Sequence, residues 1–67
     1  MENDVLYLDA VAWLKTDYIQ LYMYVSTSMI QRRFRVGYTR AAKIIERLEE
    51  SGYISAANKF GQRQVLV

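Results

Sequence analysis

Cysteine and histidine are both absent from the 67 residues of this sequence, and each absence excludes a class of chemistry. Without cysteine there is no disulfide, no thiolate metal ligand and no cysteine nucleophile. Without histidine there is no imidazole to hold a metal or to act as a general base. The carboxylates Glu46, Glu49 and Glu50 are clustered, but their spacing places them on a helix surface. The sequence therefore predicts no metal site, no cofactor and no catalytic nucleophile–base pair, and we do not expect an enzyme.

Long apolar runs are missing as well. No stretch is long enough to cross a bilayer, and the first residues, Met1 to Asp4, are acidic where a secretion signal would be basic. No GxxxxGK[ST] phosphate-binding loop is present, so this segment is not expected to hydrolyse nucleotide. There is also no repeat or linker. We expect one domain over residues 1–67, located in the cytoplasm and without membrane contact from this segment.

Charge is divided unevenly along the chain. Residues 1–27 hold four acidic side chains against Lys15, a net charge of −3, whereas residues 28–67 hold eight Lys or Arg against three Glu, a net charge of +5. A basic half suggests a polyanionic partner such as nucleic acid. The alternative is a solvated charged surface of the kind that most small domains have. The position of the cations on the predicted helices favours the first interpretation.

The stretch from Ser28 to Gly52 is typical of two helices joined by a tight turn. Ser28 is predicted to cap the first helix, and Gln31, three residues later, would complete a capping box. Gly37 would adopt the positive φ of the turn, and Thr39 would cap the second helix. That helix has a broad apolar stripe, and its end is predicted at Gly52. The stripe consists of Ala41, Ala42, Ile44, Ile45 and Leu48.

The second helix of this pair also has a basic stripe, formed by Arg40, Lys43 and Arg47 at three- and four-residue steps. Two helices with a short glycine turn and a basic second helix form the helix-turn-helix pattern, in which the second helix enters the DNA major groove. An apolar or acidic face at these positions would instead favour a protein partner.

Before this pair, residues 4–16 are predicted to form a helix capped by Asp4. Trp13 on it could stack on bases, but packing in the core is the favoured interpretation. Residues 18–25 alternate in period two and are rich in β-formers, which predicts a strand. The alternative is that the first helix continues to about Tyr22. The tyrosines of this segment could support packing or self-association; they are Tyr18, Tyr22 and Tyr24.

After the pair, two short strands over residues 53–56 and 62–67 are predicted to form a hairpin with a polar tip, with Ile54 and Val65 in the core. A hairpin that follows a helix-turn-helix is a wing. The predicted fold is therefore mostly α with a small β-sheet (α+β), a winged helix-turn-helix in the order α-β-α-α-β-β.

The sequence resembles the C-terminal gamma domain of FtsK/SpoIIIE-type bacterial DNA translocases. The long central run SMIQRRFRVGYTRAAKIIE, from Ser28 to Glu46, is similar to the pattern S-x-x-Q-R-x-[FL]-[RK]-[IV]-G-Y-N-R-A-A-[RK]-I-I-E. The first helix, with Leu6, Tyr7, Ala10 and Trp13, and the late G-x-R-x-V at Gly61, Arg63 and Val65 extend the likeness over most of the chain. The chain departs from the pattern at Thr39, where the family usually has Asn, and residues 16–24 are longer and more aromatic than expected.

The resemblance implies a winged-helix domain that recognises short, oriented, G-rich DNA sequences, directs a translocase along the chromosome and contacts a Xer-type tyrosine recombinase. No motor is present here, so the chain is either an excised domain, whose parent would be membrane-anchored elsewhere, or a free-standing protein. Two alternatives remain: a phage or plasmid regulator that binds an operator as a dimer, and a winged helix that docks proteins.

Arginine is the commonest reader of guanine, and residues at the start of a recognition helix face base edges. We therefore expect base reading by Thr39, Arg40 and Lys43, with Arg40 first. Residues of the first helix, the turn and the wing commonly meet the sugar–phosphate backbone. The expected backbone contacts are Ser28, Gln31, Arg32, Arg33, Arg35, Tyr38, Arg47, Lys59 and Arg63. For Arg33 and Arg35 solvation is the alternative, and for Tyr38 packing is the favoured interpretation.

Overall fold

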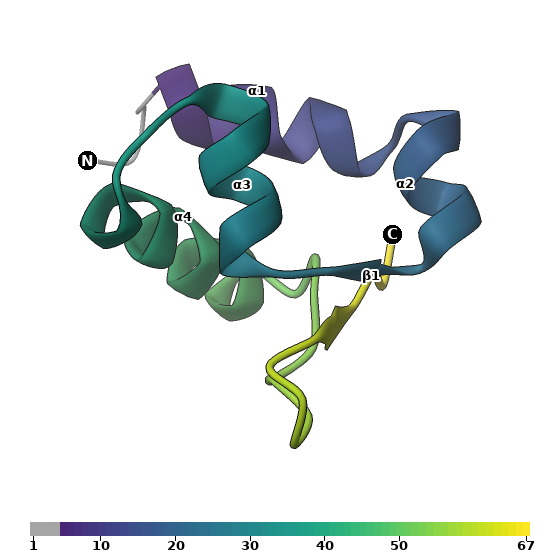
Figure 1. Ribbon diagram of the computed structural model, residues 1–67. Helices are drawn as coiled ribbons and strands as arrows, with labels where there is room; N and C mark the ends of the chain where they lie inside the picture. Colours follow the sequence, from purple (N-terminus) through teal and green to yellow (C-terminus); the bar gives the residue numbers. More distant parts are fainter. Residues whose placement is uncertain (1–4) are drawn as a thin grey trace.

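The computed structural model describes residues 5–67, so the predicted Asp4 cap and the acidic first residues lie outside the described part. The elements, in order, are α1 (Val5–Leu14), α2 (Asp17–Tyr22), β1 (Tyr24–Val25), α3 (Thr27–Phe34), α4 (Tyr38–Glu50) and β2 (Arg63–Gln64). The predicted fold class, a mostly helical winged helix-turn-helix with a small sheet, is confirmed. In Figure 1, α1 runs along the upper side of the molecule, α3 stands in the middle, and α4 lies below it.

The segment after α1 is a separate short helix. The predicted strand over residues 18–25 is wrong for most of its length, and the alternative of one continuous helix is wrong as well. A turn at Lys15 and Thr16 ends α1, and the Thr16 hydroxyl donates to the Trp13 carbonyl at 2.7 Å. α2 then buries Ile19, and the Gln20 side chain donates to the carbonyls of Leu14 (2.7 Å) and Val67 (3.1 Å). These contacts from outside the segment override its local preference for a strand.

The sheet is small, since regular pairing is limited to two residues on each of two strands. Met23 ends α2 in the left-handed conformation (φ 69°), and β1 then pairs antiparallel with β2, Tyr24 opposite Gln64 and Val25 opposite Arg63. The predicted strand over residues 53–56 is reduced to a single bridge between Ile54 and Val65. Ile54 is buried and Val65 partly buried, as the hairpin prediction requires. The predicted order α-β-α-α-β-β is therefore changed at two points: α2 is inserted after α1, and the first of the two strands expected after α4 is reduced to the bridge at Ile54.

The caps of the helix pair differ from the prediction. Ser26, not Ser28, caps α3: its backbone is extended, and its Oγ accepts from the Met29 N–H at 3.4 Å. Ser28 already lies inside the helix, so its backbone has no capping geometry. The left-handed residue that ends α3 is Arg35 (φ 56°), whereas Gly37 has φ −72° and precedes α4 as its N-cap. Thr39 is therefore the second residue of α4 and does not cap it.

The end of α4 follows the prediction. Gly52 is left-handed (φ 84°), its N–H donates to the Glu49 carbonyl at 3.0 Å, and the Tyr53 N–H donates to the Leu48 carbonyl at 2.9 Å. This pair of bonds is the Schellman motif, which satisfies carbonyls that have no partner within the helix. The chain is thereby turned sharply away from α4 and into the wing, which we define as residues 54–65.

The core lies between α1, α3 and α4. Four of the five stripe residues of α4 are buried, and Ala42 is half-buried. Trp13 is 7% exposed and packs edge-on against Phe34, with ring centroids 5.7 Å apart, so the packing interpretation of Trp13 is confirmed. Among the described residues, no helix is both long and apolar enough to span a bilayer.

Candidate nucleic-acid interface

α4 presents the three predicted base-reading residues together on its first two turns. At 3.6 residues per turn, Thr39 and Lys43 lie opposite the buried stripe, and Arg40 lies on the flank that faces α1. All three side chains are exposed. The last two turns are different, because they expose Glu46, Glu49 and Glu50. The exposed side of α4 is therefore basic where the helix begins and acidic where it ends.

Arg47, predicted to contact the DNA backbone, is held against α1. Its guanidinium carbon lies 3.9 Å from the centroid of the Tyr7 ring, a cation–π contact, and its side chain is half-buried. The Tyr7 hydroxyl in turn donates to Ser51 Oγ at 2.8 Å, just beyond the end of α4. Tyr7 thus joins α1 to the second half of α4 in two ways, which fixes how α4 sits on the core.

The turn between α3 and α4 exposes two further predicted contact residues. Arg35 occupies the left-handed position at the end of α3 and is exposed. Tyr38 begins α4 and is 66% exposed, so the packing interpretation of Tyr38 is wrong. Tyr38 shares the helix face of Ala41, but as the first residue of α4 it lies at the end of the buried stripe, where its side chain is left exposed. Both side chains are therefore accessible next to the start of α4.

The predicted contacts on α3 are divided between two sides of that helix. Ser28 and Arg32, four residues apart, share the outer side, and both are exposed. Gln31 is half-buried. Arg33 is exposed, and its guanidinium carbon lies 5.1 Å from the centroid of the neighbouring Phe34 ring. The helix-turn-helix therefore does not bring Arg33 together with Thr39, Arg40 and Lys43.

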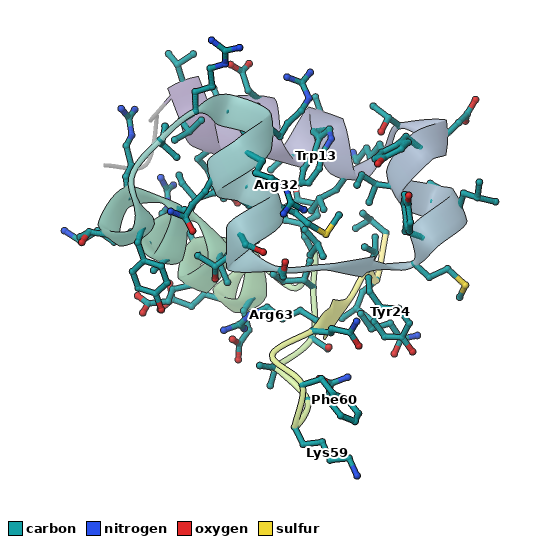
Figure 2. The ribbon with its side chains drawn as sticks, in the orientation of Figure 1. Trp13, Tyr24, Arg32, Lys59, Phe60 and Arg63 are labelled. Atoms are coloured by element: carbon teal, nitrogen blue, oxygen red, sulfur yellow. The ribbon has the colours of Figure 1, made fainter. Side chains whose placement is uncertain are left out.

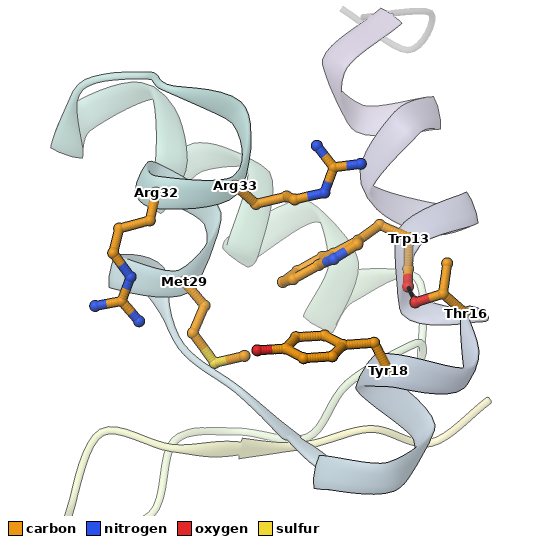
Figure 3. A pocket seen from close by; sticks show the side chains of 6 residues that line it. All are labelled: Trp13, Thr16, Tyr18, Met29, Arg32 and Arg33. Carbon is orange, nitrogen blue, oxygen red and sulfur yellow. Dashed lines mark hydrogen bonds between the residues drawn. The ribbon is translucent and has the colours of Figure 1, made fainter.

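Arg32 and Arg33 both border a groove of about 530 Å³ between α3 and the α1–α2 corner. Figure 3 shows the indole of Trp13 and the ring of Tyr18 one above the other across this groove, with the two arginines extending to opposite sides. The residues that line it are Trp13, Thr16, Tyr18, Met29, Arg32 and Arg33. None of them belongs to α4 or to the wing, so the groove is separate from the face that exposes Thr39 and Lys43.

The wing is attached to α4 at its base. Arg63 forms an ion pair with Glu49 and also donates to the Ser55 carbonyl at 3.4 Å. Its side chain is partly buried, so this predicted backbone contact is engaged within the molecule. Lys59 is exposed at the other end of the wing. Figure 2 shows Arg63 at the base, and Lys59 and Phe60 at the free end.

The tyrosines predicted to lie along a strand are instead arranged by a helix. Tyr18 and Tyr22 are four residues apart on α2, and their rings meet edge-on with centroids 4.9 Å apart. The Tyr18 hydroxyl donates to the Tyr22 hydroxyl at 3.4 Å, which raises the pKa of Tyr18 above its ordinary value, while the charge of Arg32 acts in the opposite direction. Tyr24 follows on β1, and all three side chains are exposed.

Phe60 is a functional candidate that sequence reasoning missed. It is 74% exposed at the tip of the wing, next to Lys59. The available signal was a bulky aromatic residue in an otherwise polar turn, between a lysine and a glycine. The described residues contain no group of three or more His, Cys, Asp or Glu side chains that could hold a metal ion.

The sequence also matches known proteins. The sequence model of the FtsK gamma domain matches residues 1–67. The DNA translocase FtsK of Rhizobium meliloti is 57% identical over 42 residues, which cover 63% of this chain and 5% of that protein. The DNA translocase FtsK of Bradyrhizobium diazoefficiens is 45% identical over 62 residues, which cover 92% of this chain and 7% of that protein.

The DNA translocase FtsK of Clostridium acetobutylicum is also 57% identical over 42 residues, covering 63% of this chain and 6% of that protein. The chain thus spans well under a tenth of the length of these relatives. The match of the domain model over the full sequence and the winged helix-turn-helix fold point to the same assignment: the chain belongs to the FtsK gamma domain family.

Proposed function

We propose that this chain binds double-stranded DNA sequence-specifically, with α4 in the major groove, and that it orients a DNA translocase on short, G-rich, polar sequences. The observation that carries the proposal is the charge order along α4. A helix favours acidic groups at its start and basic groups at its end. On the exposed side of α4, Arg40 lies in the first turn and Glu46, Glu49 and Glu50 lie towards the end, the reverse of that order, although the last turn also contains the half-buried Arg47. Helix stability does not explain this arrangement, whereas contact of the first turns with a polyanion does.

Within this proposal Arg40 reads guanine, because its guanidinium can donate two parallel hydrogen bonds to O6 and N7. Lys43 lies about one turn further along and reaches the adjacent base pair, and Thr39 contacts a base edge through its methyl or hydroxyl group. Substitution of Arg40 by alanine should cost roughly 1–3 kcal/mol and relax the preference at one position.

In this proposal the phosphates are contacted by residues of α3, of the turn into α4 and of the wing. We assign this role to Ser28, Gln31, Arg32, Arg35 and Tyr38, and to Lys59 on the wing. Arg47 and Arg63 are engaged with Tyr7 and Glu49, so in our proposal they position α4 and the wing. Arg33 lies on the other side of α3, so its predicted contact with a phosphate would require DNA that also reaches that side.

The experiment is a selection from random duplex DNA at near-physiological salt, with wild type, Arg40→Ala and Lys15→Ala. Lys15→Ala removes the same charge from the exposed turn after α1 and serves as the matched control. We expect a short, asymmetric, G-rich motif that loses one position in Arg40→Ala and is unchanged in Lys15→Ala. A palindrome would instead indicate a dimeric regulator. Binding without any enriched sequence would contradict specific recognition.

A second activity, contact with a Xer-type tyrosine recombinase, is supported by the groove between α3 and the α1–α2 corner. The groove combines apolar walls with two arginines and leaves α4 uncovered, so DNA and protein could be held together. The test is titration of isotope-labelled chain with such a recombinase, following the indole N–H signal of Trp13. We expect a shift that Tyr18→Ala abolishes. Recombinase binding that leaves Trp13 and Tyr18→Ala unaffected would place the contact elsewhere.

A single domain of this size makes few contacts, so we also propose that several copies act on adjacent sites, helped by self-association through Tyr18, Tyr22 and Tyr24. Sedimentation of wild type and of the Tyr22→Ala variant, with and without a duplex, tests this: the wild type should associate more strongly. Because the target is bacterial duplex DNA, we place the chain in the cytoplasm.

A further inference from the structure

Phe60 occupies an unusual position for a large apolar side chain. It is 74% exposed, whereas Phe34, the other phenylalanine, packs on Trp13 in the core. Packing within the described part of the chain therefore does not account for Phe60. Its neighbour Lys59 holds its ammonium 5.3 Å from the centroid of the Phe60 ring, so a cation and an apolar ring are presented together.

The tip that holds Phe60 is fixed by hydrogen bonds. The Asn58 side-chain oxygen accepts from the N–H of Phe60 at 2.8 Å and from that of Gln62 at 3.0 Å. The Asn58 N–H donates to the Gln62 carbonyl at 2.8 Å, and Gly61 adopts the positive φ (77°) that closes the turn. Further down, Ser55 and Gln64 are joined by two hydrogen bonds, at 3.0 and 2.9 Å. The ring is thus presented on a preorganised support, which lowers the entropic cost of binding.

The surroundings of Phe60 favour nucleic acid over protein as the partner. Residues 51–67 contain no acidic side chain; of their two cations, Arg63 is paired with Glu49 at the base of the wing, and Lys59 is exposed beside Phe60. The wing is tied to α4 through the Arg63–Glu49 ion pair, and in Figure 1 it projects past the end of α4 on the lower side of the molecule, away from α1. With α4 in the major groove, the next groove that the wing can reach is the minor groove.

We propose that Phe60 is an apolar wedge that enters the minor groove and partly unstacks one base step, while Lys59 contacts a flanking phosphate. Apolar side chains act in this way in other minor-groove proteins, where unstacking is offset by burial of the ring and by closer wrapping of the DNA. The inference rests on the DNA binding proposed above and adds a contact that α4 does not supply.

The experiment uses duplexes that contain the selected motif, with 2-aminopurine placed in turn at each position of the flanking base pairs. Four proteins are compared: wild type, Phe60→Ala, Phe60→Leu and Leu21→Ala. Leu21 is 84% exposed on α2 and is the matched control for loss of an exposed apolar side chain. Because Phe60 is also exposed, Phe60→Ala should fold normally, which circular dichroism checks.

We expect fluorescence to rise at one step with wild type, Phe60→Leu and Leu21→Ala, and not with Phe60→Ala. Affinity should fall about 10-fold in Phe60→Ala alone. Wild-type binding without a fluorescence rise overturns the wedge, whatever Phe60→Ala does to affinity, and leaves the proposed major-groove reading intact. Absence of any binding by wild type would instead refute the proposed function itself.

Discussion

Ser26 and Ser28 provide a direct test of how the helix-turn-helix is held. The Ser26 Oγ accepts from the Met29 N–H, while Ser28 is the second residue of α3. Loss of a serine N-cap costs about 0.5–2 kcal/mol. The Oγ–N distance of 3.4 Å is long for such a bond, so Ser26→Ala should fall in the lower part of that range, about 0.5–1 kcal/mol.

For a chain of 67 residues, a loss of this size corresponds to a fall in Tm of about 3–8 °C. Ser28→Ala should change stability by less than about 0.5 kcal/mol, because alanine is the better helix former and the contact that is lost, between the Ser28 and Ser26 hydroxyls, is exposed. Thermal unfolding by circular dichroism, with urea unfolding as an independent measure, compares the variants. A neutral Ser26→Ala together with a destabilising Ser28→Ala would refute the cap and restore the capping box at Ser28 and Gln31.

Two further predictions concern Arg32 and the Tyr18–Tyr22 pair. Arg32→Ala should weaken binding to all sequences alike and reduce the slope of log affinity against log salt by about 1. Lys15→Ala should change neither quantity. If Arg32→Ala changed the preference at one base pair, that result would contradict a phosphate contact. Tyr22→Phe removes the hydroxyl that accepts from Tyr18, so the pKa of Tyr18 should fall towards its ordinary value. An NMR titration of the Tyr18 ring measures this, with Tyr24→Phe as the control, and an unchanged Tyr18 pKa would show that the hydroxyl pair has no effect.

The second helix of the pair was predictable because several local signals agree there. The apolar stripe from Ala41 to Leu48 has helical period, and Gly52 supplies the left-handed residue that a Schellman motif needs. The exposure of Thr39, Arg40 and Lys43 follows from the same period. Where one pattern determines which residues are buried, it also determines which remain available for binding.

The segment around α2 was not predictable, since its sequence satisfies two periods at once. Six residues form a helix only marginally on their own. α2 is retained because Ile19 is buried in the core and Gln20 bonds to Leu14 and to Val67, which is 47 residues away. Two left-handed residues were also unexpected. Met23 and Arg35 adopt this conformation, for which sequence rules favour glycine.

Some predicted contacts proved to be engaged within the molecule. Arg47 packs on Tyr7, 40 residues earlier, and Arg63 pairs with Glu49 across the base of the wing. A basic residue at a plausible spacing cannot be assigned to DNA or to a neighbour from the sequence, because the neighbour is brought close only by the fold. Phe60 is the opposite case. From the sequence a phenylalanine is expected in the core, and only the structure shows that Phe60 is exposed and available for binding.

The reversed charge order of α4 leads to a prediction that separates fold from function. Thr39 is the second residue of α4, and the first turn of this helix contains no acidic side chain. Thr39→Asp should therefore stabilise the helix by about 0.3–1 kcal/mol through the helix dipole, and raise Tm by a few degrees. The same carboxylate would face the DNA, so affinity should fall at least about tenfold. Thr39→Asn, which keeps the site neutral, is the control. If Thr39→Asp were to bind DNA as tightly as wild type, the first turn of α4 would not lie in the groove, and the charge order would need another explanation.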